Sequence, residues 1–350
     1  MKSTLEALPV QSMEMLSTEQ LLGAWTRSEP VQFTDPTLAL TEFNLEQTFY
    51  PLGFPVQVYT NSQQVLDAAT ECWGSFDKLF DSGPLTVKIG VTEGGASCCP
   101  PAPVVRIREH LGTSIADGEN FAISDYDQGF SLVWVTSATL NHASYFSYFF
   151  LEFAAMGLIA NRCAWWIHAA CVELDGAGVL LCGDSGAGKS TLSYACARAG
   201  WTYISDDRSY LVDGRDDRLI VGNCSQARFR PAAEQIFSEL AGRDVVRRAN
   251  VGKPSIEFQI ASARQFRTSP ASRIQRIVFI NRNFNVQELV PFPAAVAKLY
   301  MLQYASCLPE TRTRQAIMFD QLIESGVYEL RYTDLDWAVE RLSQLVREGY

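Results

Sequence analysis

Residues 183–190 have the pattern G-x-x-x-x-G-K-[ST] and read GDSGAGKS. Loops of this pattern wrap phosphate groups with their backbone N–H groups, while the lysine reaches the outer phosphates. The alternative is a glycine-rich turn with an incidental lysine. The residues expected to contact a bound nucleotide are Gly183, Asp184, Ser185, Gly186, Ala187, Gly188, Lys189, Ser190 and Thr191.

The segments on either side of this loop support the phosphate-binding interpretation. Residues 178–182 form an apolar run typical of a buried strand, and residues 191–199 have a helical pattern that stops at Gly200. A loop between a strand and a helix presents N–H groups and the positive end of the helix dipole to an anion. Lys189 would then contact the β- and γ-phosphates and Ser190 would bind Mg²⁺, so ATP and Mg²⁺ are the expected cofactors.

Two adjacent carboxylates, Asp206 and Asp207, follow a strand expected at residues 201–205. Ligands of open α/β sheets bind at the carboxyl ends of strands, so this pair should face the phosphates. One carboxylate can hold the metal while the other accepts a proton from an attacking hydroxyl. The alternative is a polar turn between two strands.

His168 lies in the apolar stretch 165–174, which we expect to be one strand, and an Asp175-Gly176 hairpin turn follows it. A lone histidine in a strand is commonly a core residue with its ring hydrogen-bonded. A catalytic role is the other interpretation. The spacing of the apolar residues leaves both open.

His168, the hairpin, the loop and the two aspartates resemble, in order and spacing, the catalytic domain of bacterial HPr kinase/phosphorylase. The nucleotide fold of that family is similar to that of phosphoenolpyruvate carboxykinases. The resemblance implies that His168 contacts Asp206 and that Asp206 accepts the proton, so Asp206, His168 and Lys189 would be catalytic. It also implies that Ser190 and Asp207 hold the metal. It covers about residue 143 to the C-terminus, because residues 327–336 look like the ending of HPr-kinase-related proteins.

One segment departs from that family. Where HPr kinases carry an acidic metal-binding residue and a glycine-rich signature, residues 224–231 read CSQARFRP. HPr itself is therefore not the expected acceptor. Basic residues here and in 247–253 suit a phosphate or an acidic acceptor, and Arg228, Arg230 and Lys253 are the candidates. The alternative for the second stretch is a solvated basic loop.

Apolar periodicity divides the chain into three parts. Residues 1–40 form a tail or adapter with a helix near 17–25, in which Ser17 and Gln20 could make a capping box. Residues 41–141 form a small α+β domain with strands at 43–50, 54–59, 85–91, 104–109, 121–124 and 130–135, and a helix capped by Ser62. Residues 142–350 are expected to form an α/β domain, and the resemblance implies a P-loop fold of the HPr kinase/phosphoenolpyruvate carboxykinase-like kind.

The second half is expected to begin with a buried helix at 143–160 and to end with a helix capped by Thr333. Between them we expect strands at 274–280 and 327–331 and helices at 293–301 and 313–323. The apolar part of the first helix, residues 145–160, is shorter than the about 20 residues that cross a bilayer. No signal-peptide pattern opens the chain, so we expect a cytoplasmic protein that binds no membrane.

Charge and cysteine content restrict the partners. With 29 Lys+Arg and 39 Asp+Glu among 350 residues, the net charge of −10 repels phosphate backbones, and no nucleic acid is expected as partner. Nine cysteines without a C-x-x-C pattern and three widely spaced histidines indicate reduced thiols. They argue against a disulfide scaffold or a zinc site.

Two functions from different classes fit these features. One is an ATP-dependent kinase that transfers the γ-phosphoryl group to a hydroxyl, above all a serine of a protein or peptide, with a small-molecule hydroxyl as a variant. The other is a nucleotide-binding sensor or assembly protein without turnover. The joint presence of Lys189, Ser190 and the two aspartates favours the kinase, because a passive binder gains nothing from a base beside the γ-phosphate. The acceptor, phosphorolysis and homo-oligomer formation stay open.

Overall fold

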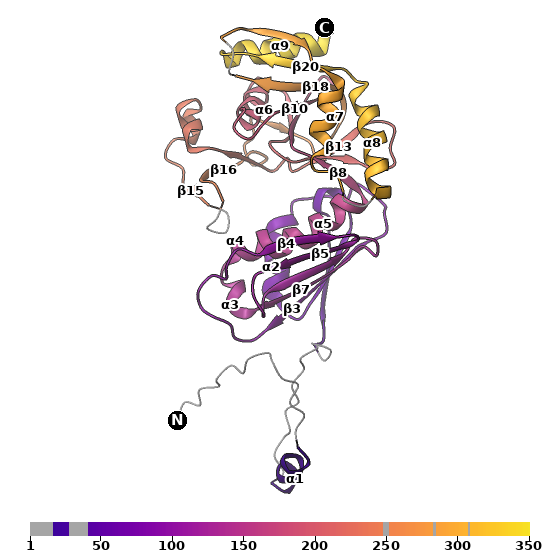
Figure 1. Cartoon of the computed structure of the whole chain (residues 1–350). Coiled ribbons are helices and arrows are strands. Elements are labelled where there is room, and N and C mark those ends of the chain that lie inside the picture. Colours follow the sequence, from indigo (N-terminus) through magenta and orange to yellow (C-terminus); the bar gives the residue numbers. More distant parts are fainter. Residues whose placement is uncertain (1–16, 28–40, 248–251, 283–284, 307–308) are drawn as a thin grey trace.

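Two mixed β-sheets organise the computed structural model, which describes residues 17–27, 41–247, 252–282, 285–306 and 309–350. Each sheet is the centre of one body, and the two bodies lie one above the other in Figure 1. The short helix α1 (Thr18–Thr26) matches the helix expected near the N-terminus. The rest of residues 1–40, the side chain of Gln20 and residues 248–251 lie outside the described part of the chain.

The first sheet has the order β1-β2-β3-β7-β6-β5-β4. Its strands β2, β3 and β7 are parallel neighbours, and the other pairs are antiparallel. The strands are β1 (Leu45–Phe49), β2 (Val56–Thr60), β3 (Leu85–Thr92), β4 (Val104–Arg108), β5 (Leu111–Ile115), β6 (Phe121–Asp125) and β7 (Phe130–Thr136). All the strands expected here are present, and the sequence pattern missed β5.

Helices cover one face of this sheet. The helices and short turns of this body are η1 (Pro51–Gly53), α2 (Gln63–Trp73), α3 (Ser137–Leu140), α4 (Ala143–Phe146), η2 (Ser147–Leu151) and α5 (Glu152–Arg162). Ser62 is the N-cap residue of α2, as expected, although its hydroxyl makes no capping hydrogen bond.

The helical run 143–162 packs on the first sheet and does not open the second body as expected. Its buried residues Phe150, Ala154 and Leu158 recur at helical spacing and join the core of β3, β6 and β7. By length and composition this run could cross a membrane. Here part of its apolar surface packs on the sheet, as in the buried helix that the sequence predicts.

The second sheet has the order β17-β11-β9-β10-β18-β13-β12-β8, with β20 beside β18 and β19 beside β20. Its strands are β8 (Ala164–Ile167), β9 (Ala169–Leu174), β10 (Ala177–Cys182), β11 (Thr202–Ser205), β12 (Ser209–Val212), β13 (Leu219–Gly222), β17 (Arg267–Thr268), β18 (Ala271–Asn281), β19 (Glu288–Pro291) and β20 (Val327–Arg331). A small third sheet contains β14 (Gln226–Phe229), β16 (Ser255–Gln259) and β15 (Val245–Val246).

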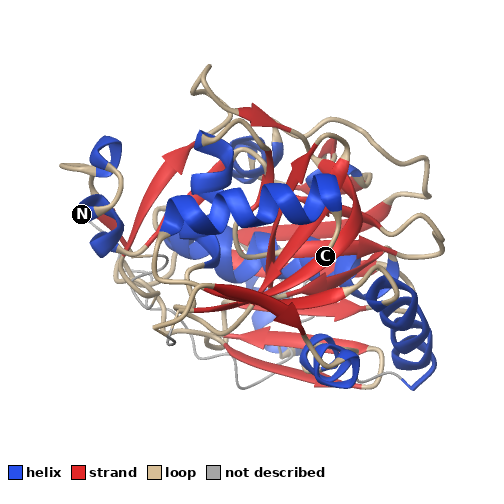
Figure 2. Cartoon of the chain, turned by 90° about the horizontal axis from the view of Figure 1, so that it is seen from above, coloured by secondary structure: helices blue, strands red, loops and turns tan. Residues whose placement is uncertain are grey.

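The helices of the second body lie on both faces of its sheet, and α9 crosses the strands in the view from above (Figure 2). Strand β10 is fully buried because Val179 and Leu181 pack in the core shared with α6 and α9, whereas Leu180 and Cys182 pack in the core shared with α7 and α8. The helices and turns are α6 (Lys189–Arg198), η3 (Pro231–Gln235), η4 (Ser238–Leu240), α7 (Ala294–Leu302), α8 (Pro309–Ile323) and α9 (Leu335–Glu348).

Two local predictions for the second body are wrong. The stretch expected as one strand at 165–174 breaks at His168 into β8 and β9, which lie far apart in the sheet. Asp334, and not Thr333, caps α9, because its carboxylate accepts a hydrogen bond from the Trp337 N–H at 2.7 Å. The carboxylate also suits the positive end of the helix dipole.

Strand direction explains why distant residues meet. Strand β9 runs antiparallel to its two neighbours, β10 and β11. The start of β9, just after His168, therefore lies at the same edge as the ends of β10 and β11. The glycine-rich loop follows β10 and Asp206 follows β11, so the sheet brings all three to one edge.

Candidate functional site

The loop between β10 and α6 has backbone conformations that only glycine adopts easily. Gly183 has φ +144° and Gly188 has φ +106°. A side chain at Gly183 would also come within 3.3 Å of the Ile280 carbonyl, and one at Gly188 within 3.2 Å of Arg282 Cδ. These two glycines let the chain turn directly into α6, whose N-terminal N–H groups stay open at the loop.

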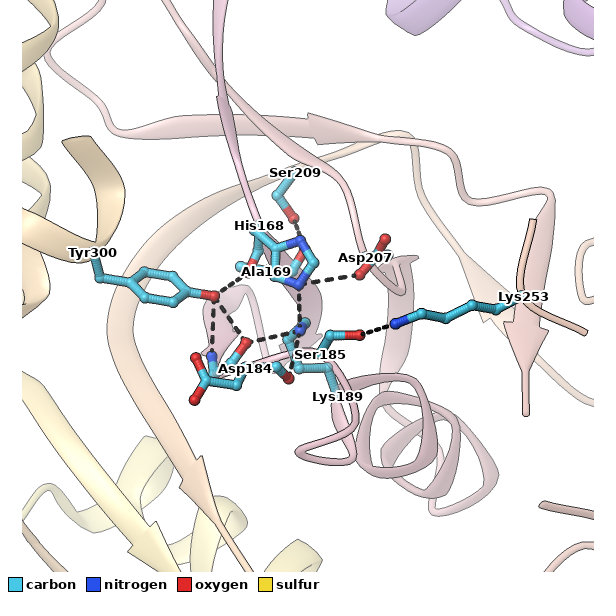
Figure 3. Close-up of polar contacts among 10 residues, drawn as sticks. His168, Ala169, Asp184, Ser185, Lys189, Asp207, Ser209, Lys253 and Tyr300 are labelled. Atoms are coloured by element: carbon cyan, nitrogen blue, oxygen red, sulfur yellow. Dashed lines mark hydrogen bonds and ion pairs between the residues drawn. The ribbon is translucent and has the colours of Figure 1, made fainter. Parts of the chain in front are cut away.

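The Lys189 side chain is folded back over the loop (Figure 3). It is only 5% exposed, and its Nζ donates hydrogen bonds to the Gly183 carbonyl at 2.8 Å and the Asp184 carbonyl at 3.3 Å. Its third contact is His168 Nε2 at 2.7 Å. Burial lowers the pKa of Lys189, whereas the nearby Asp207 carboxylate opposes this by favouring the charged form.

His168 is a polar contact of the loop lysine and not an isolated core residue. Burial lowers the pKa of His168, and the Lys189 charge lowers it further. A neutral imidazole with its proton on Nδ1 can accept a hydrogen bond from Lys189 Nζ at Nε2, and this tautomer fits the 2.7 Å distance between the two nitrogens. The same Nε2 lies 3.6 Å from Asp207 Oδ1. The contact implied by the resemblance, between His168 and Asp206, is replaced by contacts with Asp207 and Lys189.

The two aspartates have different surroundings. Asp206 is partly buried and its Oδ2 accepts a hydrogen bond of 2.7 Å from the Arg228 backbone N–H, which turns its carboxylate toward β14. Burial raises the pKa of Asp206 to about 6, and the negative charge of Asp207 adds to the rise. Asp207 is exposed, with 53% of its side chain accessible. Asp206 is thus a carboxylate whose proton affinity suits general-base catalysis near neutral pH.

Tyr300 on α7 ties the start of the loop to the start of β9. Its hydroxyl lies 2.7 Å from the His168 carbonyl and 2.9 Å from the Gly183 carbonyl, and it accepts a hydrogen bond of 3.2 Å from the Gly183 N–H. The sequence analysis missed this residue. It lies within a mostly apolar helix, where no motif singles it out.

A cleft of about 860 Å³ between the two bodies contains these groups. The expected loop residues that line it are Ser185, Gly186, Gly188, Lys189, Ser190 and Thr191, whereas Gly183, Asp184 and Ala187 do not. His168, Asp206 and Asp207 line it as well. All the catalytic and metal candidates therefore share one cavity.

The three basic candidates also reach the cleft. Arg228 pairs with Glu257 at 2.7 Å, and its Nη2 donates to Ser255 Oγ at 3.0 Å. Lys253 Nζ donates to Ser185 Oγ at 3.4 Å, so it contacts the glycine-rich loop itself (Figure 3). Arg230 is exposed at the rim. Arg230 and Lys253 thus bring positive charge to the cleft, whereas the charge of Arg228 is paired with Glu257.

The opposite wall of the cleft comes from the first body and was not anticipated. It is largely apolar and aromatic, which resembles ordinary partly buried core in the sequence. Its members are Pro51, Leu52, Cys72, Trp73, Phe76, Ala102, Tyr148, Phe149, Met156 and one acidic residue, Glu152. Only the packing of the two bodies reveals that these residues face the glycine-rich loop.

The cleft residues fit a nucleotide with a divalent cation. Among the described residues, no group of three or more His, Cys, Asp and Glu side chains could hold a metal ion alone. Mg²⁺ commonly takes one or two protein oxygens and completes its shell with water and phosphate oxygens. The Asp207 carboxylate and the Ser190 hydroxyl, both at the cleft, suit that mode of binding.

Comparison with known proteins gives sequence similarity to one kind of enzyme. Over 60 residues, the chain is 42% identical to the HPr kinase/phosphorylase of Limosilactobacillus reuteri strain DSM 20016 and to that of Limosilactobacillus reuteri subsp. reuteri strain JCM 1112. This stretch is 17% of the chain and 18% of each relative, so the chain matches less than a fifth of their length. No family model matches the chain.

A solved structure of the HPr(Ser) kinase/phosphatase from Coxiella burnetii aligns with 53% of this chain and 99% of its own. The TM-score is 0.29 and the sequence identity is 13%. The sequence match confirms the resemblance that the loop, the histidine and the aspartates predict: over part of its length, this chain is HPr kinase-like.

Proposed function

We propose that the chain is an ATP-dependent kinase that transfers the γ-phosphoryl group to a hydroxyl, above all a serine of a protein or peptide. One observation carries the proposal. The glycine-rich loop with its buried Lys189 and the raised-pKa carboxylate of Asp206 line the same cleft. The similarity to proteins named HPr kinase/phosphorylase supports phosphoryl chemistry in particular.

In this proposal the loop residues bind the nucleotide phosphates. The N–H groups at the start of α6 and the Lys189 ammonium stabilise the negative charge of the phosphates. Lys189 exchanges one of its present acceptors for a phosphate oxygen, and His168 keeps it oriented through the Nε2 contact. A cation held by Asp207 and Ser190 would neutralise charge on the phosphates.

Asp206 serves as the proton acceptor. The oxygen of the acceptor hydroxyl attacks the γ-phosphorus, the new O–P bond forms as the bond to the ADP oxygen breaks, and the hydroxyl proton passes to the Asp206 carboxylate. A carboxylate with a pKa of about 6 is ionised at neutral pH and still a stronger base than an ordinary aspartate.

The test is phosphate transfer from radiolabelled ATP with Mg²⁺ to a panel of serine-containing proteins and peptides. Wild type should label an acceptor on serine, and Lys189→Ala should lose transfer together with ATP affinity measured by calorimetry, because its cation binds the outer phosphates. Arg198→Ala, at the far end of α6, is the matched control and should retain both.

The outcomes separate the two classes of function. Saturable ATP binding without transfer or hydrolysis would favour a nucleotide-binding sensor or assembly protein. Failure to bind ATP up to millimolar concentration would refute both. Reverse phosphorolysis is tested by incubating labelled phosphoprotein with inorganic phosphate and following release of the label.

A further inference from the structure

The outer edge of the first sheet has an unusual combination of charge and apolar surface. Strand β4 reads VVRIR, and all five of its residues are exposed. Among the described residues β4 pairs only with β5. Alternate residues of an edge strand direct their N–H and C=O groups away from the sheet, so a further strand can pair with them.

The charge of β4 differs from that of the whole chain. The protein has a net charge of −10, yet β4 carries Arg106 and Arg108 and no acidic residue. The two arginines lie on the same face, because side chains alternate along a strand. Val105 and Ile107 point to the other face, and each is 50% exposed. This edge therefore offers two cations next to the exposed Val104 on one side and two apolar side chains on the other.

A second copy of the chain fits this edge poorly. If two β4 strands paired antiparallel about a two-fold axis centred on Arg106 or on Ile107, arginine would lie opposite arginine. Like charges directly opposite each other destabilise a strand pair. An extended peptide with acidic residues at alternate positions instead places a carboxylate opposite each arginine and apolar side chains beside Val105 and Ile107.

The position of β4 connects this edge to the cleft. Ala102, two residues before the strand, lines the cleft that contains Lys189 and Asp206. Strand β4 also lies on the side of the first sheet that faces the second body (Figure 1). A peptide paired with β4 would therefore have one end directed at the cleft.

We propose that β4 is a docking strand for an extended acidic peptide segment, which pairs with it as an added strand. Its assignment as the recognition site for the acceptor rests on the proposed kinase function. The acceptor would carry alternating acidic and apolar residues beside the serine that enters the cleft. The docking energy would come from backbone hydrogen bonds, and the sequence preference from Arg106 and Arg108.

The binding experiment uses the full chain and a fluorescein-labelled synthetic peptide of alternating valine and glutamate that ends in a serine. Fluorescence anisotropy should give saturable binding that weakens with added salt. Arg106→Glu/Arg108→Glu should weaken it about tenfold or more and should favour the matching valine-lysine peptide. Arg106→Lys/Arg108→Lys keeps the charges and should retain binding. Because all four substitutions are at exposed positions, the unfolding temperature should stay unchanged.

Transfer to the serine of the same peptide separates this proposal from the kinase proposal. The charge-reversed variant should raise KM for the valine-glutamate peptide, with kcat unchanged and with ordinary activity toward a serine peptide that lacks this segment. Lys189→Ala should still bind the peptide while losing transfer. Binding without any transfer would leave the docking strand standing and refute the kinase.

Three results would overturn the docking strand. They are absence of binding to the valine-glutamate peptide, equal binding of the valine-glutamate and valine-lysine peptides, and transfer with the same KM in wild type and in the charge-reversed variant. Sedimentation of the protein alone gives a further test. A dimer that the charge reversal changes would assign the edge to a second copy and would also overturn the proposal.

Discussion

Replacing Asp206 by asparagine should make the protein more stable at neutral pH and nearly inactive in transfer. The folded-state pKa of Asp206 is about 6, against an ordinary value of 3.8, because burial disfavours the charged carboxylate. The difference of about 2 pH units corresponds to about 3 kcal/mol of destabilisation when the group is ionised. Asparagine is neutral and can still accept the hydrogen bond from the Arg228 N–H.

The sign of the pH dependence follows from the raised pKa. Between pH 3.8 and about 6 the folded state binds more protons at Asp206 than the unfolded state does, so wild type loses stability as pH rises through this window. The Asp206→Asn variant lacks this loss. It should exceed wild type by about 1–3 kcal/mol at pH 7.5, and the gain should shrink toward zero near pH 4.

Urea unfolding followed by tryptophan fluorescence at both pH values measures this difference. In parallel, phosphate transfer at pH 7.5 should fall about 10²–10⁴-fold, the range for loss of a general base. Asp207→Asn is the matched control. Because Asp207 is exposed, its ionised carboxylate carries little desolvation cost, and Asp207→Asn should change the free energy of unfolding less than Asp206→Asn does. A less stable Asp206→Asn protein at pH 7.5, or a gain of equal size at pH 4, would refute the reasoning.

Three further substitutions test the remaining contacts. His168→Ala removes an acceptor of the Lys189 hydrogen bond and should lower the rate of transfer about 10–100-fold in steady-state kinetics. The ATP affinity measured by calorimetry should stay within a few-fold of wild type. A loss of stability with unchanged transfer would instead show that His168 is a core residue. Asp207→Asn should weaken the Mg²⁺ dependence of ATP binding in a calorimetric titration over Mg²⁺ concentration, since an amide is the poorer ligand, and an unchanged dependence would exclude Asp207 as a ligand. Tyr300→Phe leaves buried backbone groups of the loop without a partner and should destabilise the protein by about 1–3 kcal/mol in urea unfolding, whereas wild-type stability would contradict its role as an anchor.

Local sequence signals identified the loop and its neighbours because local physics controls them. A glycine-rich turn between an apolar strand and a helix needs only adjacent residues, and β10 and α6 lie where the pattern predicts. The same holds for the Asp175-Gly176 hairpin, in which both residues have positive φ. Short apolar stretches likewise predicted β3 and β7 to within a residue, because strands that are buried on one or both faces are rich in apolar residues.

Tertiary structure decided which side chains meet. No spacing predicts that His168 faces Asp207 and Lys189 and not Asp206, because this depends on β9 lying between β10 and β11 and on the Arg228 N–H turning Asp206 away. The anchor Tyr300 depends on a contact between residues more than a hundred positions apart, and the apolar wall of the cleft depends on how the first body packs against the second. Such contacts produce no local period in a sequence, because they depend on the order of the strands in the sheet and not on the spacing of neighbouring residues.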